Sequence, residues 1–227
     1  MVSAVILPGA SPSVTSERIA ANLRTEILDG LIKPGQRLRQ EEVAQRLGTS
    51  RLPVREALRM LETEGLIENE SNKGARVPRL DMHSLDVIYQ MRERLEPLAL
   101  AVSLPLLGLA EIRELSRIQD RIEAKFDIAR FLDLDREFHL LSYSECPVDQ
   151  LSAMVLRMWN STQSYRRAFV AMSGPERAWV INAEHRLLID AIERGDVPDA
   201  DRHLSGHIRR TRIELARHPE LFLSVEP

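Results

Sequence analysis

Six histidines are spread through the chain, and one of them follows a carboxylate at a spacing that suits metal binding. Asp135 precedes His139 by four residues, and such a pair lies on one face of a helix. A carboxylate and an imidazole together form a two-pronged ligand for a divalent cation. A single histidine is more often a surface or core residue than a ligand, so this pair alone does not make a site.

Two more histidines lie in segments whose apolar spacing is typical of helices packed in a bundle. His185 and His207 each have apolar residues at helical intervals around them, so both side chains are able to face a bundle interior. Antiparallel neighbouring helices would bring the two together. His203 precedes His207 by four residues on approximately the same face, and it remains a competitor for the same role.

A stripe of arginines marks a second type of chemistry. Arg51, Arg55 and Arg59 are spaced four residues apart, so on one helix they form a single cationic face. The planar fork of arginine grips phosphate and pairs with guanine O6 and N7 in the DNA major groove. The other interpretation is a solvated amphipathic face on which the arginines pair with Glu56 and Glu62.

The elements around this stripe favour the DNA interpretation. A first helix is expected to begin at Thr15-Ser16 and to end at Asp29-Gly30. A short helix over residues 40–47 ends at Gly48, and a third begins at Ser50 with Pro53 inside its first turn, where proline is tolerated. This spacing is typical of a helix-turn-helix.

Two short strands are predicted after the third helix. They cover residues 66–68 and 75–77 and flank the turn residues Asn72, Lys73 and Gly74. A hairpin in this position is expected to form the wing of a winged helix-turn-helix.

From Asp81 onward the pattern changes to long helical segments with few glycines. No strand-like alternation is present, so we expect an all-helical bundle of six to seven helices and a mainly α protein. The expected division is a mobile arm over residues 1–14, a winged helix-turn-helix domain over 15–79 and a helical domain over 80–227. The predicted helical segments are 83–104, 109–124, 126–145, 148–171, 175–194 and 196–217.

Composition supports two modest domains in a chain of 227 residues. With 44% hydrophobic residues, 29% charged residues and one cysteine, the chain is expected to be globular and cytoplasmic. The apolar stretch Leu98–Ala110 is interrupted and too short for a membrane span. Residues 1–80 hold 12 Lys and Arg against 10 Asp and Glu, and residues 81–227 hold 19 against 24, so the N-terminal part is the more basic.

The N-terminal motif resembles a known family of regulators. The run LRQEEVAQRLGTSRLPVREALRMLETEGLIENESNKGARV is similar to the GntR DNA-binding domain, with the signature LAxxLGVSRxPVREALxxLxxEGL and a wing glycine. Two departures are Leu52, where the family often has threonine, and Glu42, where some relatives have arginine. The resemblance implies that the operator-binding positions are Arg39, Ser50, Arg51, Pro53, Arg55, Arg59, Lys73 and Gly74.

The C-terminal segments LDREFHLL and EHRLLIDAIERGD, with the later His207, resemble the FadR-type ligand-binding domain, called FCD. Its metal-binding members hold a divalent ion, here expected to be zinc or nickel, with the positions that correspond to Asp135, His139, His185 and His207. The segment IYQMRERLEPLA also fits this domain and places Arg92 as a candidate for an effector carboxylate, although a helix-helix salt bridge is nearly as well supported.

Together these resemblances predict a repressor that binds a palindromic operator in double-stranded DNA as a homodimer. A small organic acid, sensed at the metal site, is expected to control it. The alternative is a metal-dependent hydrolase fused to a DNA-binding module, with Glu184 as its general base. Glu184 and His185 are adjacent, however, and adjacent helical residues point about 100° apart, which makes that assignment poor.

Overall fold

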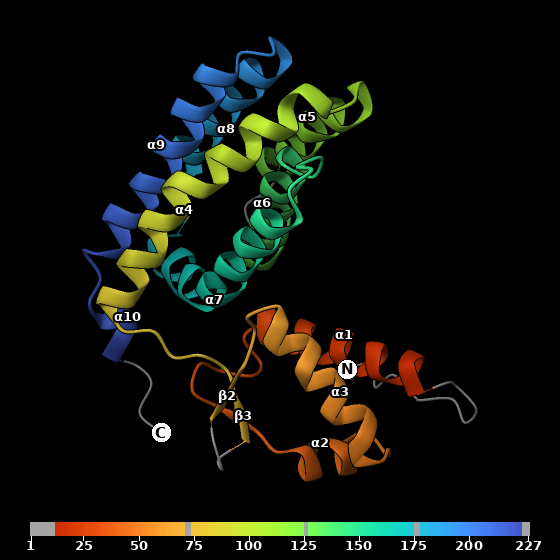
Figure 1. Ribbon diagram of the computed structural model, residues 1–227. Coiled ribbons are helices and arrows are strands. Elements are labelled where there is room, and N and C mark those ends of the chain that lie inside the picture. Colours follow the sequence, from red (N-terminus) through yellow and green to blue (C-terminus); the bar gives the residue numbers. More distant parts are fainter. Residues whose placement is uncertain (1–11, 71–73, 125–126, 175–177, 224–227) are drawn as a thin grey trace. The chain divides into compact units, whose positions relative to one another are not determined.

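A computed structural model describes residues 12–70, 74–124, 127–174 and 178–223 of the chain (Figure 1). Its contacts divide the chain into two compact units, one formed mainly by residues up to Leu80 and the other mainly from Asp81 onward. The first contains three helices and a small sheet, and the second is helical throughout its described residues. The predicted fold class, a winged helix-turn-helix followed by a helical bundle, is confirmed.

Three helices build the core of the first unit: α1 (Pro12–Leu28), α2 (Gln40–Arg46) and α3 (Arg51–Thr63). Gly48, between α2 and α3, has φ of 62°, a conformation that side chains with a Cβ disfavour. α1 already begins at Pro12, so residues 12–14 of the expected arm are helical, and residues 1–11 lie outside the described part. The most deeply buried residues of this core include Leu23, Val54, Ala57 and Leu61.

The wing is a three-stranded antiparallel sheet in the order β1 (Arg37–Leu38), β3 (Gly74–Arg76), β2 (Glu68–Glu70). The prediction that the first wing strand begins at residue 66 is wrong by two residues. Leu66 and Ile67 are consecutive and both buried, whereas a strand with one solvated face alternates. β1 was not predicted, because two residues carry no periodicity.

The second unit is built from long helices whose starts are fixed by aspartates. Asp81, Asp127 and Asp196 each accept a hydrogen bond from the backbone N–H three residues later, so they cap three of these helices. None of the helices in the described part of the chain has the length and apolar content that a bilayer crossing requires. The elements are α4 (Met82–Ser103), a 3-10 turn (Leu104–Leu106), α5 (Leu109–Ala124), α6 (Ile128–Ser142), α7 (Asp149–Ser173), α8 (Ala178–Glu193), α9 (Val197–Leu215) and the short α10 (Glu220–Leu223).

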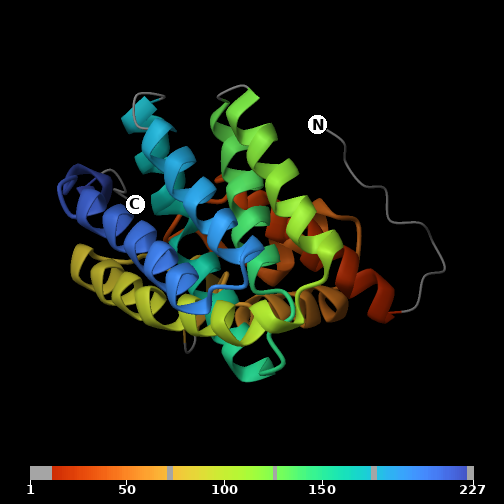
Figure 2. The same cartoon turned by 90° about the horizontal axis from the view of Figure 1, so that it is seen from above.

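Packing within the second unit brings three separate helices to one place. α9 packs along both α4 and α8, and α5 packs against both α6 and α8 (Figures 1 and 2). The turn at Gly195, with φ of 64°, reverses the chain so that α8 and α9 are neighbours. α6 ends at Ser142, three residues before the predicted end, and residues 143–145 form a turn ahead of Pro147.

Candidate functional site

The outer face of α3 carries the arginine stripe. The side chains of Arg51, Arg55 and Arg59 are 70%, 49% and 63% exposed, whereas Val54 and Leu61 on the other face are fully buried. The amphipathic helix predicted from the spacing is therefore present, with its cationic face directed to solvent.

Each of these arginines lies beside a carboxylate. Arg51 is 2.9 Å from Glu41, and Arg55 and Arg59 are 3.5 and 3.3 Å from Glu56. Ion pairs this exposed contribute only about 0–1 kcal/mol, so a phosphate or a base is able to replace the carboxylate. The face is thus available to a polyanion, although it is electrically close to neutral in the free protein.

The remaining operator-binding positions implied by the sequence are distributed around this helix. Arg39 is the N-cap of α2 and pairs with Glu42 at 3.0 Å, and Ser50 is the exposed N-cap of α3. Pro53 is buried in the first turn of α3, so it shapes the start of the helix and offers no side chain to DNA.

In the wing, Gly74 is the first residue of β3, with φ of 84° and open space where a Cβ would lie. Lys73 lies outside the described residues.

The second unit brings together the carboxylate and three imidazoles that the sequence proposed as ligands. Asp135 and His139 come from α6, His185 from α8 and His207 from α9. All four are buried, and one potential ligand atom from each lies within 4.8 Å of the others. The imidazole centroids are 5.0–5.1 Å apart, so the three rings form a nearly equilateral triangle.

His203, the competitor for this role, lies outside the cluster, and its Nε2 is 3.6 Å from Asp199.

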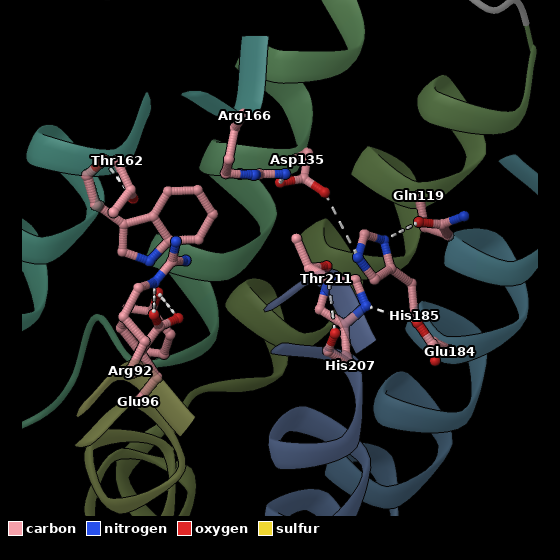
Figure 3. Close-up of polar contacts among 12 residues, drawn as sticks. Arg92, Glu96, Gln119, Asp135, Thr162, Arg166, Glu184, His185, His207 and Thr211 are labelled. Carbon is pink, nitrogen blue, oxygen red and sulfur yellow. Dashed lines mark hydrogen bonds and ion pairs between the residues drawn. The ribbon is translucent and has the colours of Figure 1, made fainter. Parts of the chain in front are cut away.

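Hydrogen bonds from surrounding residues set the tautomers of two of these histidines (Figure 3). Nδ1 of His185 is 2.8 Å from the amide oxygen of Gln119, and Nδ1 of His207 is 2.8 Å from a carboxylate oxygen of Glu184. Because both oxygens accept, each Nδ1 donates its proton. Each Nε2 is left with a lone pair, which is the form that binds metal.

Two buried polar atoms without hydrogen bonds indicate that a cation fits the cluster. Within the described part of the chain, Oδ1 of Asp135 and Nε2 of His185 have no hydrogen-bond partner. They lie 3.7 Å apart, so a carboxylate oxygen and a nitrogen lone pair face each other in the buried interior of the bundle. Buried polar atoms are rarely left unsatisfied, and a divalent cation between these two would satisfy both.

The electrostatics of the cluster favour the ligand form of every member. Burial lowers the pKa of His185 to about 3 and that of His207 to about 4, and it lowers the pKa of His139 well below its ordinary value. Burial alone would raise the pKa of Asp135, but Arg166 and the neighbouring histidines together hold it below its usual range. At neutral pH the cluster is one carboxylate and three neutral imidazoles.

Arg166 and Gln119 were not among the residues singled out in the sequence. Arg166 of α7 donates to Oδ2 of Asp135 at 2.6 Å, and Gln119 of α5 holds His185. Gln119 is fully buried between apolar residues of α5, so a polar residue at a core-facing position was the only available signal.

Replacing Arg166 by methionine is expected to lower the free energy of unfolding by about 3–5 kcal/mol in chelator, because it leaves Asp135 as a buried uncompensated charge. Urea titration measures this change. The control is Arg186→Met, since Arg186 is 41% exposed and pairs with Asp120 and Glu123 near the surface. That substitution should cost less than about 1 kcal/mol. Equal losses in the two variants would contradict a structural role for the Arg166–Asp135 pair.

Arg92, the predicted effector contact, is buried in α4. Its Nε donates to Glu96 at 2.5 Å, and the other oxygen of Glu96 accepts from the hydroxyl of Tyr143 at 3.0 Å. The guanidinium also lies 4.8 Å from the ring centroid of Tyr89. Its charge is therefore matched within the bundle, and contact with an effector stays a prediction.

Known protein families match both units. A model of the FCD domain matches residues 87–210, and a model described as bacterial regulatory proteins of the gntR family matches residues 15–77. These matches cover the Asp/His cluster and the arginine stripe respectively.

Individual proteins resemble most of the chain. The uncharacterized HTH-type transcriptional regulator YdhC of Bacillus subtilis is 27% identical over 82% of this chain and 84% of its own length. A probable D-xylose utilization operon transcriptional repressor of Paenarthrobacter nicotinovorans is 29% identical over 89% of this chain and 91% of its own. The solved structure of E. coli McbR/YncC has a TM-score of 0.77 at 23% identity, covering 90% of this chain and 98% of that one, which supports the fold.

Proposed function

This chain belongs to the GntR family of bacterial regulatory proteins and carries an FCD domain, and from that premise we propose that it represses transcription and is released from DNA by a small organic acid. Like its relatives, it is a transcriptional regulator and not an enzyme. A repressor is favoured because the relative from Paenarthrobacter nicotinovorans is named as one. Since the protein would bind chromosomal DNA, we expect it in the cytoplasm.

DNA binding is proposed for a domain over residues 15–79. The exposed stripe of Arg51, Arg55 and Arg59 would enter a major groove, with Arg39 and Ser50 beside it and the wing near Gly74 on the flanking backbone. A homodimer would place two such helices on a palindrome, with half-sites about one helical turn, or a multiple of it, apart.

Sensing is proposed for a domain over residues 80–227. Asp135, His139, His185 and His207 would hold a divalent ion, and the observation that carries this proposal is the facing pair of unbonded atoms on Asp135 and His185. Zinc or nickel suits three imidazoles and one carboxylate. Gln119 and Glu184 orient two of the imidazoles, and Arg166 orients the carboxylate.

Regulation requires that the effector bind one conformation of the protein better than another, since only differential affinity shifts a conformational equilibrium. We propose that the effector-bound conformation holds the two recognition helices at a spacing or mobility that no longer fits the operator. The effector would thereby lower the affinity for DNA.

The test of this function begins with selection of duplex DNA from a random library by the purified protein. A palindromic sequence should emerge, and elemental analysis of the same protein should find near-stoichiometric zinc or nickel. A thermal-shift screen of small carboxylates, with and without chelator, should then find one that raises the melting temperature only when metal is present. Failure to select any common sequence would refute the DNA-binding part, and metal-free protein that is indifferent to chelator would refute the metal part.

A further inference from the structure

The helical unit contains a cavity one helical turn away from the Asp/His cluster. Each of three lining residues lies four positions from a ligand of the cluster: Phe131 before Asp135 on α6, Ile181 before His185 on α8, and Thr211 after His207 on α9. Four residues correspond to about 6 Å along a helix, so the cavity adjoins the cluster on one side. Its enclosed part has a volume of only about 40 Å³ and the rest opens to solvent, so the cavity suits a compact ligand.

The wall of this cavity is largely apolar among the described residues. Phe169 and Val170 are buried lining residues from α7. Such a wall is typical of ligand pockets, which are lined mainly by hydrophobic and aromatic side chains. The apolar side chains of the wall are Phe131, Phe169, Val170, Ala178, Val180 and Ile181.

Most of the polar side chains in the wall are already engaged. The Thr211 hydroxyl donates to the carbonyl of His207, and Glu214 pairs with Arg217 at 2.9 Å. Glu184 bonds His207 on one side and forms an ion pair with Arg210 on the other. Because the rest of the wall is largely apolar, most hydroxyl groups of a polyhydroxylated ligand would be left without partners, and that strongly disfavours binding.

Arg210 is the only cation among the described lining residues. Its side chain is 48% exposed, so donors of the guanidinium beyond those facing Glu184 are open to solvent. An anion bound to Arg210 would share the guanidinium with Glu184, and Glu184 in turn bonds to the Nδ1 of His207. Occupation of the cavity is thus linked by two contacts to a member of the Asp/His cluster.

We propose that this cavity receives the effector, and that the effector is a carboxylate with a compact apolar body, aromatic or branched aliphatic, whose carboxylate binds Arg210. This inference rests on the proposed sensor role of the helical unit. It narrows the class of organic acid, because sugar acids and other polyhydroxy acids are excluded.

The experiment is calorimetric titration of the full-length protein with phenylacetate and isovalerate, with uncharged phenylacetamide, and with gluconate as a polyhydroxy acid. Phenylacetate or isovalerate should bind at least about tenfold more tightly than gluconate, and phenylacetate more tightly than its amide, because the acid adds a charge-assisted bond to Arg210. The proposal is overturned if neither apolar acid binds, or if gluconate binds as well as they do.

Two pairs of variants locate the site. Ala178→Phe should fill the cavity and weaken binding of phenylacetate and its amide at least about tenfold, whereas Ala183→Phe, an exposed position on the same helix outside the wall, should leave both unchanged. Arg210→Ala should abolish the preference for acid over amide, and Arg209→Ala, also exposed, should retain it. Unchanged binding in Ala178→Phe, or an unchanged preference in Arg210→Ala, would overturn the proposal.

Metal content, measured on the same samples, separates this inference from the function on which it rests. Metal-free protein that still binds phenylacetate through Ala178 and Arg210 would refute the metal site and support the cavity. Metal-loaded protein that binds neither apolar acid would refute the cavity and support the metal site.

Discussion

Replacing His139 and His185 together by alanine is expected to remove the bound metal and to lower the melting temperature of the helical unit. The two side chains come from α6 and α8, so their loss removes donors from two of the three helices at the cluster. A ligand that binds only the folded state at about 100–1,000 times its Kd stabilises that state by about 2.7–4.1 kcal/mol. At about 2–4 °C per kcal/mol, the melting temperature should fall by about 5–16 °C.

The measurement combines elemental analysis with thermal unfolding in the presence and absence of chelator. Wild-type protein should lose stability when chelator is added, and the double variant should not respond. The matched control replaces His203 and His218, two histidines outside the cluster that lie beside Asp199 and Glu220. This control should keep full metal occupancy. A double variant of His139 and His185 that retains one metal per chain would refute the assignment of the site.

Arg55→Ala is expected to weaken operator binding by about 1–3 kcal/mol, that is about fivefold to more than a hundredfold, if the guanidinium makes a bidentate base contact. Arg55 is the middle residue of the stripe, and its ion pair with Glu56 is 3.5 Å long, so little is lost within the free protein when it is removed. If Arg55 binds phosphate instead, the number of counterions released on binding should fall by about one. The loss of affinity should then be similar for all DNA sequences.

Fluorescence anisotropy on the selected operator, at several salt concentrations, distinguishes these two outcomes. The control is Arg117→Ala on α5, because Arg117 is 69% exposed and pairs with a glutamate three residues away in the same manner as Arg59. Its affinity for DNA should match that of the wild type. Wild-type affinity for Arg55→Ala at equal salt would remove Arg55 from the interface.

Features that depend on spacing within one helix could be predicted from the sequence. The faces of α3 and α6 follow from separations of four residues, so the arginine stripe and the Asp135–His139 pair needed no knowledge of the fold. The FCD resemblance supplied the other two ligands. The helical bundle was equally accessible, because its segments are long and strongly periodic.

Features that depend on contacts between helices could not be predicted in the same way. Arg166 meets Asp135 across 31 positions, and Gln119 meets His185 across 66. Such meetings depend on how each helix is rotated and placed, and the period of a single helix does not specify this. Glu184 shows the difficulty, since its position beside His185 gave it a hypothetical role as a base, whereas in the structure it holds His207.

The start of the first wing strand was predicted wrongly for another reason. Leu66 and Ile67 were assigned to a strand because a short apolar run is typical of one, yet they belong to the core that precedes it. Runs this short carry no period that separates the two interpretations.

The carboxylates beside the arginine stripe have a consequence for how the protein finds its target. Glu41, Glu42 and Glu56 lie within 3.5 Å of arginines on the face that would meet DNA, so each opposes the general attraction of the phosphate backbone. That attraction supplies nearly all of the affinity for random sequence. We expect short residence times on the rest of the chromosome and faster sampling of sites. The glutamates would thus weaken the affinity for non-operator DNA and widen the difference from the affinity for the operator. Less of the protein would then be bound by the excess of competing sequence.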